Sequence, residues 1–157
     1  MEDLFLDSGI FIKLFDCLNT SGRKSSHEEV LELYHQLRNG YNFITTNIVI
    51  CESFNFISNL IFKSSNLYSV DDLITFNSTF IESDVSIFYL DDEKFYNRAL
   101  EIIENFQQYK FNYIDAISLS FIEEMGGFIT FTLDDSWKNF TFLKGYTPTQ
   151  IEVIEFK

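Results

Sequence analysis

Leu4-Phe5-Leu6-Asp7-Ser8-Gly9-Ile10-Phe11 indicates a strand that is followed at once by a helix. The run from Leu4 to Leu6 is apolar without alternation and stops at Asp7, which is typical of a strand buried on both faces. Ser8-Gly9 is expected to turn the chain, and apolar residues at helical spacing then predict a helix over 10–18. A buried strand that leads into a helix is the first half of an α/β unit.

The alternation of strands and helices continues along the chain. Apolar and β-branched runs predict further strands over 42–46, 85–90, 128–132 and 151–156. Apolar periodicity predicts helices over 30–37, 48–62, 69–82, 93–106 and 113–125. Ser26 and Glu29 form a capping box before the first of these helices, and Asn47 is expected to cap the second. Because the helix over 48–62 is apolar on most faces, we expect it to be buried.

Strands that alternate with helices predict a mainly parallel sheet covered on both faces. We therefore expect a three-layer α/β/α fold with four or five central strands, in one domain spanning 1–157. The composition agrees, because 46% of the residues are hydrophobic and 19 are Phe, which is enough for one sizeable core. With only 6 Gly and 1 Pro, the chain holds no linker rich in these residues.

The charge of the chain is strongly negative. It has 11 Lys and Arg against 24 Asp and Glu, a formal charge of -13, and a pI near 4.4. This balance argues against attraction to nucleic acid or to an anionic membrane by bulk electrostatics. Cys17 and Cys51 are isolated, which is usual for thiols in a reducing compartment. The acidic N-terminus is unlike a signal peptide, and the longest apolar stretch, over 48–62, is too short to span a bilayer, so we expect a soluble cytoplasmic protein.

Most acids stand at helix starts or on exposed helix faces, but a few interrupt apolar segments. Asp7 ends the first strand, and Asp134 and Asp135 follow the strand over 128–132. Glu52 lies in an apolar helix, and Asp115 lies near the start of another. Each has an ordinary explanation as well: Asp7 and Asp115 as helix caps, Glu52 as a solvent-facing side chain, and the last pair as turn residues.

Taken together, these acids indicate a metal site. In a parallel α/β sheet the ends of strands and the starts of the following helices meet at one edge, where ligands bind. Carboxylates gathered at that edge repel one another, and a hard cation relieves the repulsion. Mg²⁺ and Mn²⁺ suit such a site because they prefer oxygen ligands and keep several waters.

The same segments resemble the motifs of PIN-domain ribonucleases, especially the VapC-like toxins of toxin–antitoxin pairs. The strand ending in Asp7-Ser8 is similar to the opening motif, and Thr45 to Glu52 is similar to the second. Asp115-Ala116-Ile117-Ser118 resembles the third motif, and Phe131-Thr132-Leu133-Asp134 resembles the fourth. The four stand in the family's order and cover roughly residues 4–146.

This resemblance implies a Mg²⁺- or Mn²⁺-dependent endoribonuclease in which Asp7, Glu52, Asp115 and Asp134 are catalytic and bind metal. Asp135 could assist or replace Asp134, and Ser8 would support the site by hydrogen bonding. The resemblance also implies a homodimer, an RNA substrate and a cognate antitoxin protein, with no role for a membrane. RNA would need positive contacts, and the candidates are Lys13, Arg23, Lys24, Lys138 and Lys144.

Two alternatives follow from where the sequence departs from these motifs. The family usually has Ser or Thr before the third acid, and here Ile114 stands in its place. The chain could therefore be a catalytically impaired PIN-like domain that acts as an interaction module. A haloacid-dehalogenase-type phosphatase also begins with a strand ending in Asp, but it needs a second Asp where this chain has Gly9.

Overall fold

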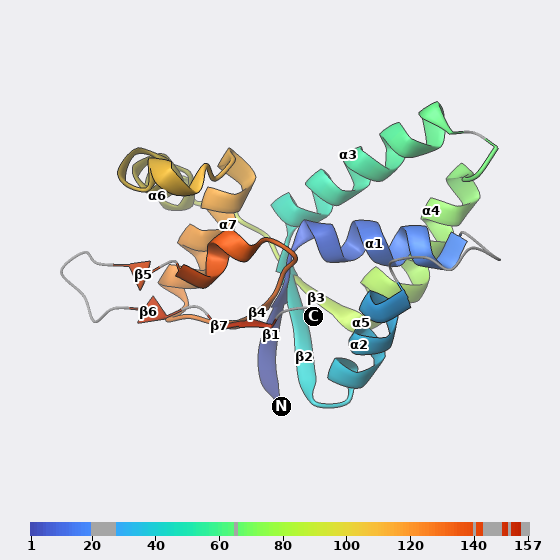
Figure 1. Cartoon of the computed structure of the whole chain (residues 1–157), viewed down its shortest axis with the longest axis horizontal. Coiled ribbons are helices and arrows are strands. Elements are labelled where there is room, and N and C mark those ends of the chain that lie inside the picture. The colour runs from blue at the N-terminus through green and yellow to red at the C-terminus, as the bar shows by residue number, and fades with distance from the viewer. Residues whose placement is uncertain (20–27, 65, 140, 143–148, 151, 155–157) are drawn as a thin grey trace.

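The computed structural model describes residues 1–19, 28–64, 66–139, 141–142, 149–150 and 152–154 of the chain (Figure 1). The predicted capping residue Ser26 and the candidate cations Arg23, Lys24 and Lys144 lie outside these residues.

The fold is α/β, with a central sheet of five parallel strands in the order β3-β2-β1-β4-β7. The strands are β1 (Glu2–Leu6), β2 (Tyr41–Thr46), β3 (Val85–Phe88), β4 (Ile129–Phe131) and β7 (Glu152–Ile154). Two short strands, β5 (Thr141–Phe142) and β6 (Thr149–Gln150), form a separate antiparallel pair. The predicted parallel sheet of four or five strands is confirmed, and β7 is the edge strand expected within 151–156.

The first strand lies in the middle of the sheet, between β2 and β4. Leu4, Phe5 and Leu6 are fully buried, because helices cover both faces of β1. The apolar run at the start of the chain therefore builds the centre of the core.

Helices form the outer layers (Figure 1). On one side of the sheet lie α1 (Ser8–Asn19), α2 (Glu28–Arg38), α3 (Asn47–Lys63) and α4 (Val70–Phe76), and on the other side lie α6 (Glu93–Asn105) and α7 (Tyr113–Glu124). Aromatic rings pack in both layers: Phe15 meets Phe76 with centroids 5.7 Å apart, and Phe5 meets Phe121 at 6.2 Å. Trp137, in the 3-10 helix η3 (Asp135–Asn139), is buried against Phe5.

Three local expectations were wrong. Ser8 and Gly9 make no separate turn, because α1 begins directly at Ser8. Thr46 caps α3, since its hydroxyl accepts a hydrogen bond from the Val49 amide, and Asn47 is the first helical residue. The helix predicted over 69–82 is interrupted: α4 passes into a π-helix, η1 (Asn77–Ile81), and then into the short α5 (Glu82–Asp84).

The helix over 48–62 is also less buried than its composition suggests. The residues of α3 that face the core are Val49, Ser53, Ile57 and Ile61. By contrast, Phe56 is half exposed and Phe62 is 78% exposed. The apolar residues of α3 are thus more numerous than its buried stripe requires, and the excess lies on the surface. No helix among the described residues is long and apolar enough to cross a membrane.

Candidate metal-binding edge of the sheet

The candidate carboxylates come from separate elements that end or begin at the carboxyl edge of the sheet. Asp7 joins β1 to α1, and Glu52 stands in the second turn of α3, which follows β2 directly. Asp115 lies in the first turn of α7, and Asp134 follows β4. In Figure 1 the starts of α1 and α3 lie at the same end of the strands. The topology therefore brings together residues that are more than a hundred positions apart.

Asp7 is the most deeply buried of these acids, with 7% of its surface exposed. Its Oδ1 accepts a hydrogen bond from the Ser8 amide at 2.7 Å, and its Oδ2 accepts one from the Thr132 hydroxyl at 2.7 Å. Burial raises the pKa of Asp7 to about 6, although these two hydrogen bonds oppose the shift. The charges of Glu52 and Asp134 raise this pKa further, which places both acids within electrostatic range of Asp7.

Asp115 is set by the start of its helix. The backbone amide of Asp115 donates to Asn112 Oδ1 at 2.8 Å, and Asp115 Oδ2 accepts from the backbone amide of Asn112 at 3.1 Å. The two residues therefore form a capping box. The pKa of Asp115 is raised to about 7, and burial is the largest cause. The charge of Asp7 raises this pKa as well, and the charges of Glu52 and Asp134 add smaller contributions. Glu52 and Asp134 thus act electrostatically on both Asp7 and Asp115.

Asp134 and Asp135 differ in their surroundings, although both are exposed. Asp134 Oδ1 accepts from the Ser136 amide at 2.9 Å and from the Ser136 hydroxyl at 2.6 Å. The backbone amide of Asp134 donates to the Thr132 hydroxyl at 3.1 Å. Asp135 is the first residue of η3. The charge of Asp134 contributes to the raised pKa of both Asp7 and Asp115.

Thr132 was not identified as a site residue from the sequence. It is buried directly after β4, and its hydroxyl lies between the Asp7 carboxylate and the Asp134 amide. Thr45 also supports this part of the chain, because its hydroxyl donates at 2.8 Å to the carbonyl of Leu6, the residue before Asp7. A threonine in a strand is ordinary, so neither residue gave a signal beyond its position next to a motif acid.

The supporting role predicted for Ser8 has a partial counterpart in the structure. The Ser8 backbone amide, and not a side-chain atom, makes the 2.7 Å contact with Asp7. Lys13 lies half-buried in α1, and Lys138 lies in η3. Contacts of these lysines with RNA stay a prediction.

The donor set suits a hard divalent cation. Its atoms are carboxylate oxygens, and two of them belong to acids whose raised pKa shows that their charge is poorly compensated. The Ser118 hydroxyl, one turn after Asp115 on the same face of α7, is buried and has no hydrogen-bond partner among the described residues. A water in the shell of an ion held at Asp115 would satisfy such a group.

The same residues do not form a finished cage. Within the described part of the chain, no three His, Cys, Asp or Glu side chains are grouped closely enough to hold one ion together. Mg²⁺ commonly binds through only one or two carboxylates and completes its shell with waters.

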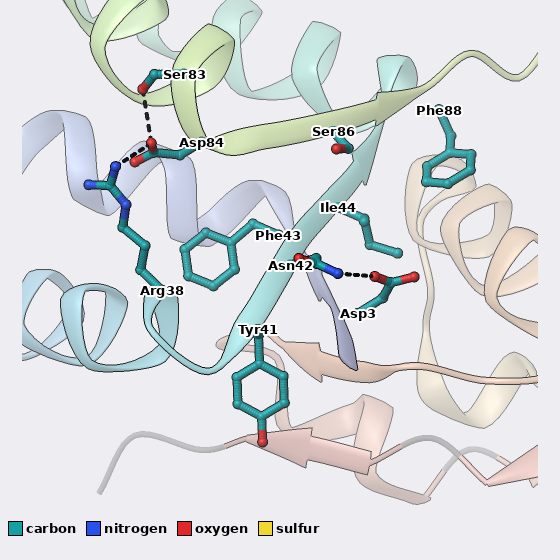
Figure 2. Close-up of a pocket in the computed structure, with 10 residues that line it drawn as sticks. All are labelled: Asp3, Arg38, Tyr41, Asn42, Phe43, Ile44, Ser83, Asp84, Ser86 and Phe88. Carbon is teal, nitrogen blue, oxygen red and sulfur yellow. Dashed lines mark hydrogen bonds and ion pairs between the residues drawn. The ribbon is translucent and has the colours of Figure 1, made fainter. Parts of the chain in front are cut away.

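A hollow of about 430 Å³ lies elsewhere, along β2 and β3 (Figure 2). At one end Arg38 pairs with Asp84 at 2.7 Å, and nearer its middle Asn42 donates to Asp3 at 3.2 Å. None of the candidate carboxylates lines this hollow, so it is separate from the chemistry considered above.

Comparisons with known proteins agree with the topology. No protein-family model matches the sequence, and no curated protein matches it significantly. The structure is similar to the crystal structure of VapC20 from Mycobacterium tuberculosis, a toxin that cleaves the sarcin–ricin loop. The TM-score is 0.58 at 14% sequence identity, and the match covers 79% of this chain and 84% of that toxin's chain. At this identity the likeness establishes the fold alone.

Proposed function

On the premise that this chain has the PIN fold, which the likeness to VapC20 shows, we propose that it is a metal-dependent endoribonuclease that hydrolyses RNA phosphodiester bonds. One observation carries the proposal. The candidate acids follow strands or begin helices at the carboxyl edge of the sheet, in PIN order, and the charges of Glu52 and Asp134 contribute to the raised pKa of both Asp7 and Asp115.

Each acid has a part in this proposal. Asp7 and Asp115 hold a Mg²⁺ or Mn²⁺ ion, because burial and the charges of the neighbouring acids raise the pKa of both carboxyls. Glu52 and Asp134 bind a second ion or orient the attacking water. When bound, the ion supplies Lewis acidity toward the scissile phosphate and lowers the pKa of a water. The Thr132 hydroxyl holds the Asp7 carboxylate in place through its hydrogen bond to Oδ2.

Cleavage of RNA tests this proposal directly. We expect the wild type to cleave RNA in Mg²⁺ or Mn²⁺, and Asp7→Asn and Asp115→Asn to abolish cleavage. Asp71→Asn is the matched control, since Asp71 is an exposed acid in the first turn of α4, away from the carboxyl edge. Equal cleavage by the wild type and Asp7→Asn would contradict the assignment.

The second candidate function is a PIN-like interaction module without activity. It is favoured by Ile114, and by the finding that the described acids form no group of three around one point. Calorimetric titration with Mn²⁺ separates the two functions. A working site binds Mn²⁺ and loses that binding in Asp7→Asn, whereas an impaired one gives no heat of binding in either protein.

The biological role that we propose is that of a toxin, acting as a homodimer in the cytoplasm and held in check by an antitoxin. An Arg-bearing antitoxin segment would suit a groove lined by carboxylates. Expression of the chain should then arrest growth, and a small DNA-binding protein encoded next to it should relieve the arrest. Light scattering after size exclusion would determine whether the chain is a dimer, and growth unaffected by the active protein would contradict the toxin role.

A further inference from the structure

Strand β3 forms one edge of the parallel sheet. It pairs with β2 alone, and the pairing continues to the end of the strand, where Phe88 lies opposite Thr46. Among the described residues, no backbone group outside the sheet makes a hydrogen bond with residues 86–88. Within that part of the chain, the side of β3 that faces away from β2 is therefore open. The N–H and C=O groups along an open edge can pair with another strand.

The segment that forms this edge lacks the features that usually protect an edge strand. Natural edges are commonly closed to other chains by a Lys, a Pro, a bulge or a charge that points inward. The residues over 85–90 are Val-Ser-Ile-Phe-Tyr-Leu, without a charge or a proline. The register with β2 runs without a bulge. Because β-branched and aromatic residues favour strands, this segment is suited to pair with one more.

The hollow of about 430 Å³ reaches this edge. Ser86 and Phe88 of β3 line it together with Ile44 of β2 (Figure 2). Ile44 lies opposite Ser86 in the register, so the three side chains share one face of the sheet. Phe88 is 37% exposed there, although its ring meets Phe121 of α7 with centroids 5.2 Å apart. A strand added beside β3 would place alternate side chains over this face, where the hollow offers them apolar contact.

Exposed acids stand at both ends of the uncharged segment. Glu82 precedes it, and the run Asp-Asp-Glu over 91–93 follows it. Asp84 lies closer to β3, but its charge is offset by Arg38 at 2.7 Å. The two ends of this edge therefore carry negative charge, while its middle carries none.

These charges discriminate between the possible occupants of the edge. A second copy that paired antiparallel through its own β3 would bring residues 91–93 of one copy toward Glu82 of the other, and like charges repel. RNA phosphates would meet the same acids. A strand with Lys or Arg at both ends instead meets an opposite charge at each end.

We propose that the free edge of β3 binds an extended segment of a partner protein, which is uncharged over a length like that of β3 and carries Lys or Arg at both ends. The segment adds a sixth strand to the five-stranded sheet. Main-chain hydrogen bonds supply affinity, the hollow receives alternate side chains, and the acids fix the position of the segment along the edge. None of the candidate metal-binding acids lines the hollow, so this docking site goes beyond the nuclease function and does not depend on it.

Fluorescence anisotropy with a labelled synthetic peptide tests this docking site in the absence of metal and RNA. The peptide alternates Val and Thr over the length of β3 and has a pair of Lys at each end. In one control peptide Glu replaces Lys, and in another Pro replaces the central residues, which removes N–H groups but keeps every Lys. We expect the Lys peptide to bind, and both control peptides to bind about tenfold more weakly.

Amide hydrogen exchange locates the peptide on the protein. Residues 86–88 should exchange more slowly when the Lys peptide is bound, because their outward N–H groups gain partners. Glu82→Lys and Asp91→Lys should each weaken binding of this peptide by about threefold, and each should strengthen binding of the Glu peptide. Asp71→Lys is the matched control, since Asp71 is an exposed acid in the first turn of α4.

Equal binding of the Lys peptide and the Pro peptide would overturn the proposal, because the contact would then be attraction between charges and not strand pairing. Exchange at residues 86–88 that stays unchanged when the peptide binds would overturn it as well. If the same amides slow when the concentration of the protein alone is raised, a second copy occupies the edge and the partner segment does not. Absence of RNA cleavage by the wild type has no bearing on these measurements, so the docking site and the nuclease function are tested apart.

Discussion

At the scale of single residues, the burial of Asp7 has a measurable cost. An Asp with a pKa of 3.8 in the unfolded chain and about 6 in the folded one holds its proton longer when folded. Between these values the folded protein binds more protons than the unfolded one, so the free energy of unfolding falls as the pH rises through this window. The shift corresponds to about 3 kcal/mol in the free energy of unfolding, and this amount is fully lost once the pH is above about 6. The raised pKa of Asp115, about 7, acts in the same direction.

Asp7→Asn should therefore stabilise the metal-free protein. We expect the free energy of unfolding in urea to rise by about 1–3 kcal/mol at about pH 7.5, and the gain to shrink toward zero below about pH 3, where the carboxyl is protonated in both states. Asp71→Asn, at an exposed helix start, serves as the control. A variant less stable than the wild type at neutral pH would show that Asp7 is compensated within the folded chain.

Thr132 links Asp7 to Asp134, and its hydroxyl can be removed without changing the size of the side chain. Thr132→Val leaves Asp7 Oδ2 and the Asp134 amide without their partner. We expect a loss of about 1–3 kcal/mol in stability, together with weaker Mn²⁺ binding in calorimetry, while Thr132→Ser keeps both. Thr130→Val is the control, since Thr130 is buried in β4, two residues earlier, and its hydroxyl donates to the Phe128 carbonyl. Mn²⁺ binding unchanged in Thr132→Val would remove Thr132 from the site.

At the scale of elements, the start of α7 both begins a helix and places a catalytic candidate. Asn112→Ala removes the side-chain oxygen that accepts from the Asp115 amide. The expected cost is about 1 kcal/mol of stability, measured by urea unfolding, and Asn112→Ser should recover most of it. Because Asp115 is the other half of this capping box, Mn²⁺ affinity should fall as well. If stability falls but Mn²⁺ affinity does not, the cap supports the helix alone.

The elements also show what the sequence could and could not foretell. Asp7, Glu52 and Asp115 could be singled out from the sequence because a charge inside an apolar segment breaks a pattern over a few residues. Thr132 gave no such signal, since its partner Asp7 is 125 positions away. Thr46 and Asn47 are both good caps, and the choice between them depends on Leu90, whose amide takes the Asn47 oxygen. Phe62 looked like core because composition records how apolar a helix is and not how wide its buried stripe is.

At the scale of the whole molecule, the charge of -13 limits how RNA can be bound. Acids outnumber basic residues 24 to 11, and within the described part of the chain Arg38, Lys94 and Arg98 are each held in an ion pair. Few phosphates can then be neutralised, so the affinity for RNA should depend only weakly on salt. We expect log Kd against log salt to have a slope of about 1–2, measured by anisotropy with Asp7→Asn, against about 0.7 for each phosphate contact on a single strand.

A charge reversal beyond the end of β3 provides the comparison for this prediction. Asp91→Lys replaces an exposed acid there with a cation and should tighten RNA binding while raising the slope by about 0.7. A steep slope in the parent protein would mean that basic residues carry the binding after all.

The position of β1 has a consequence for the order in which the protein is made. This strand is synthesised first, yet it lies between β2 and β4, and Asp7 receives its Thr132 hydrogen bond only when the chain has grown by a further 125 residues. A fragment ended after Gly127 holds Asp7, Glu52 and Asp115 but lacks the neighbour that completes the sheet, and it should neither unfold cooperatively nor cleave RNA. Cleavage by that fragment would show that β4 is dispensable. If the chain is the nuclease that we propose, a nascent chain is harmless to the RNA of its ribosome, because its site is completed only after β4 has been made.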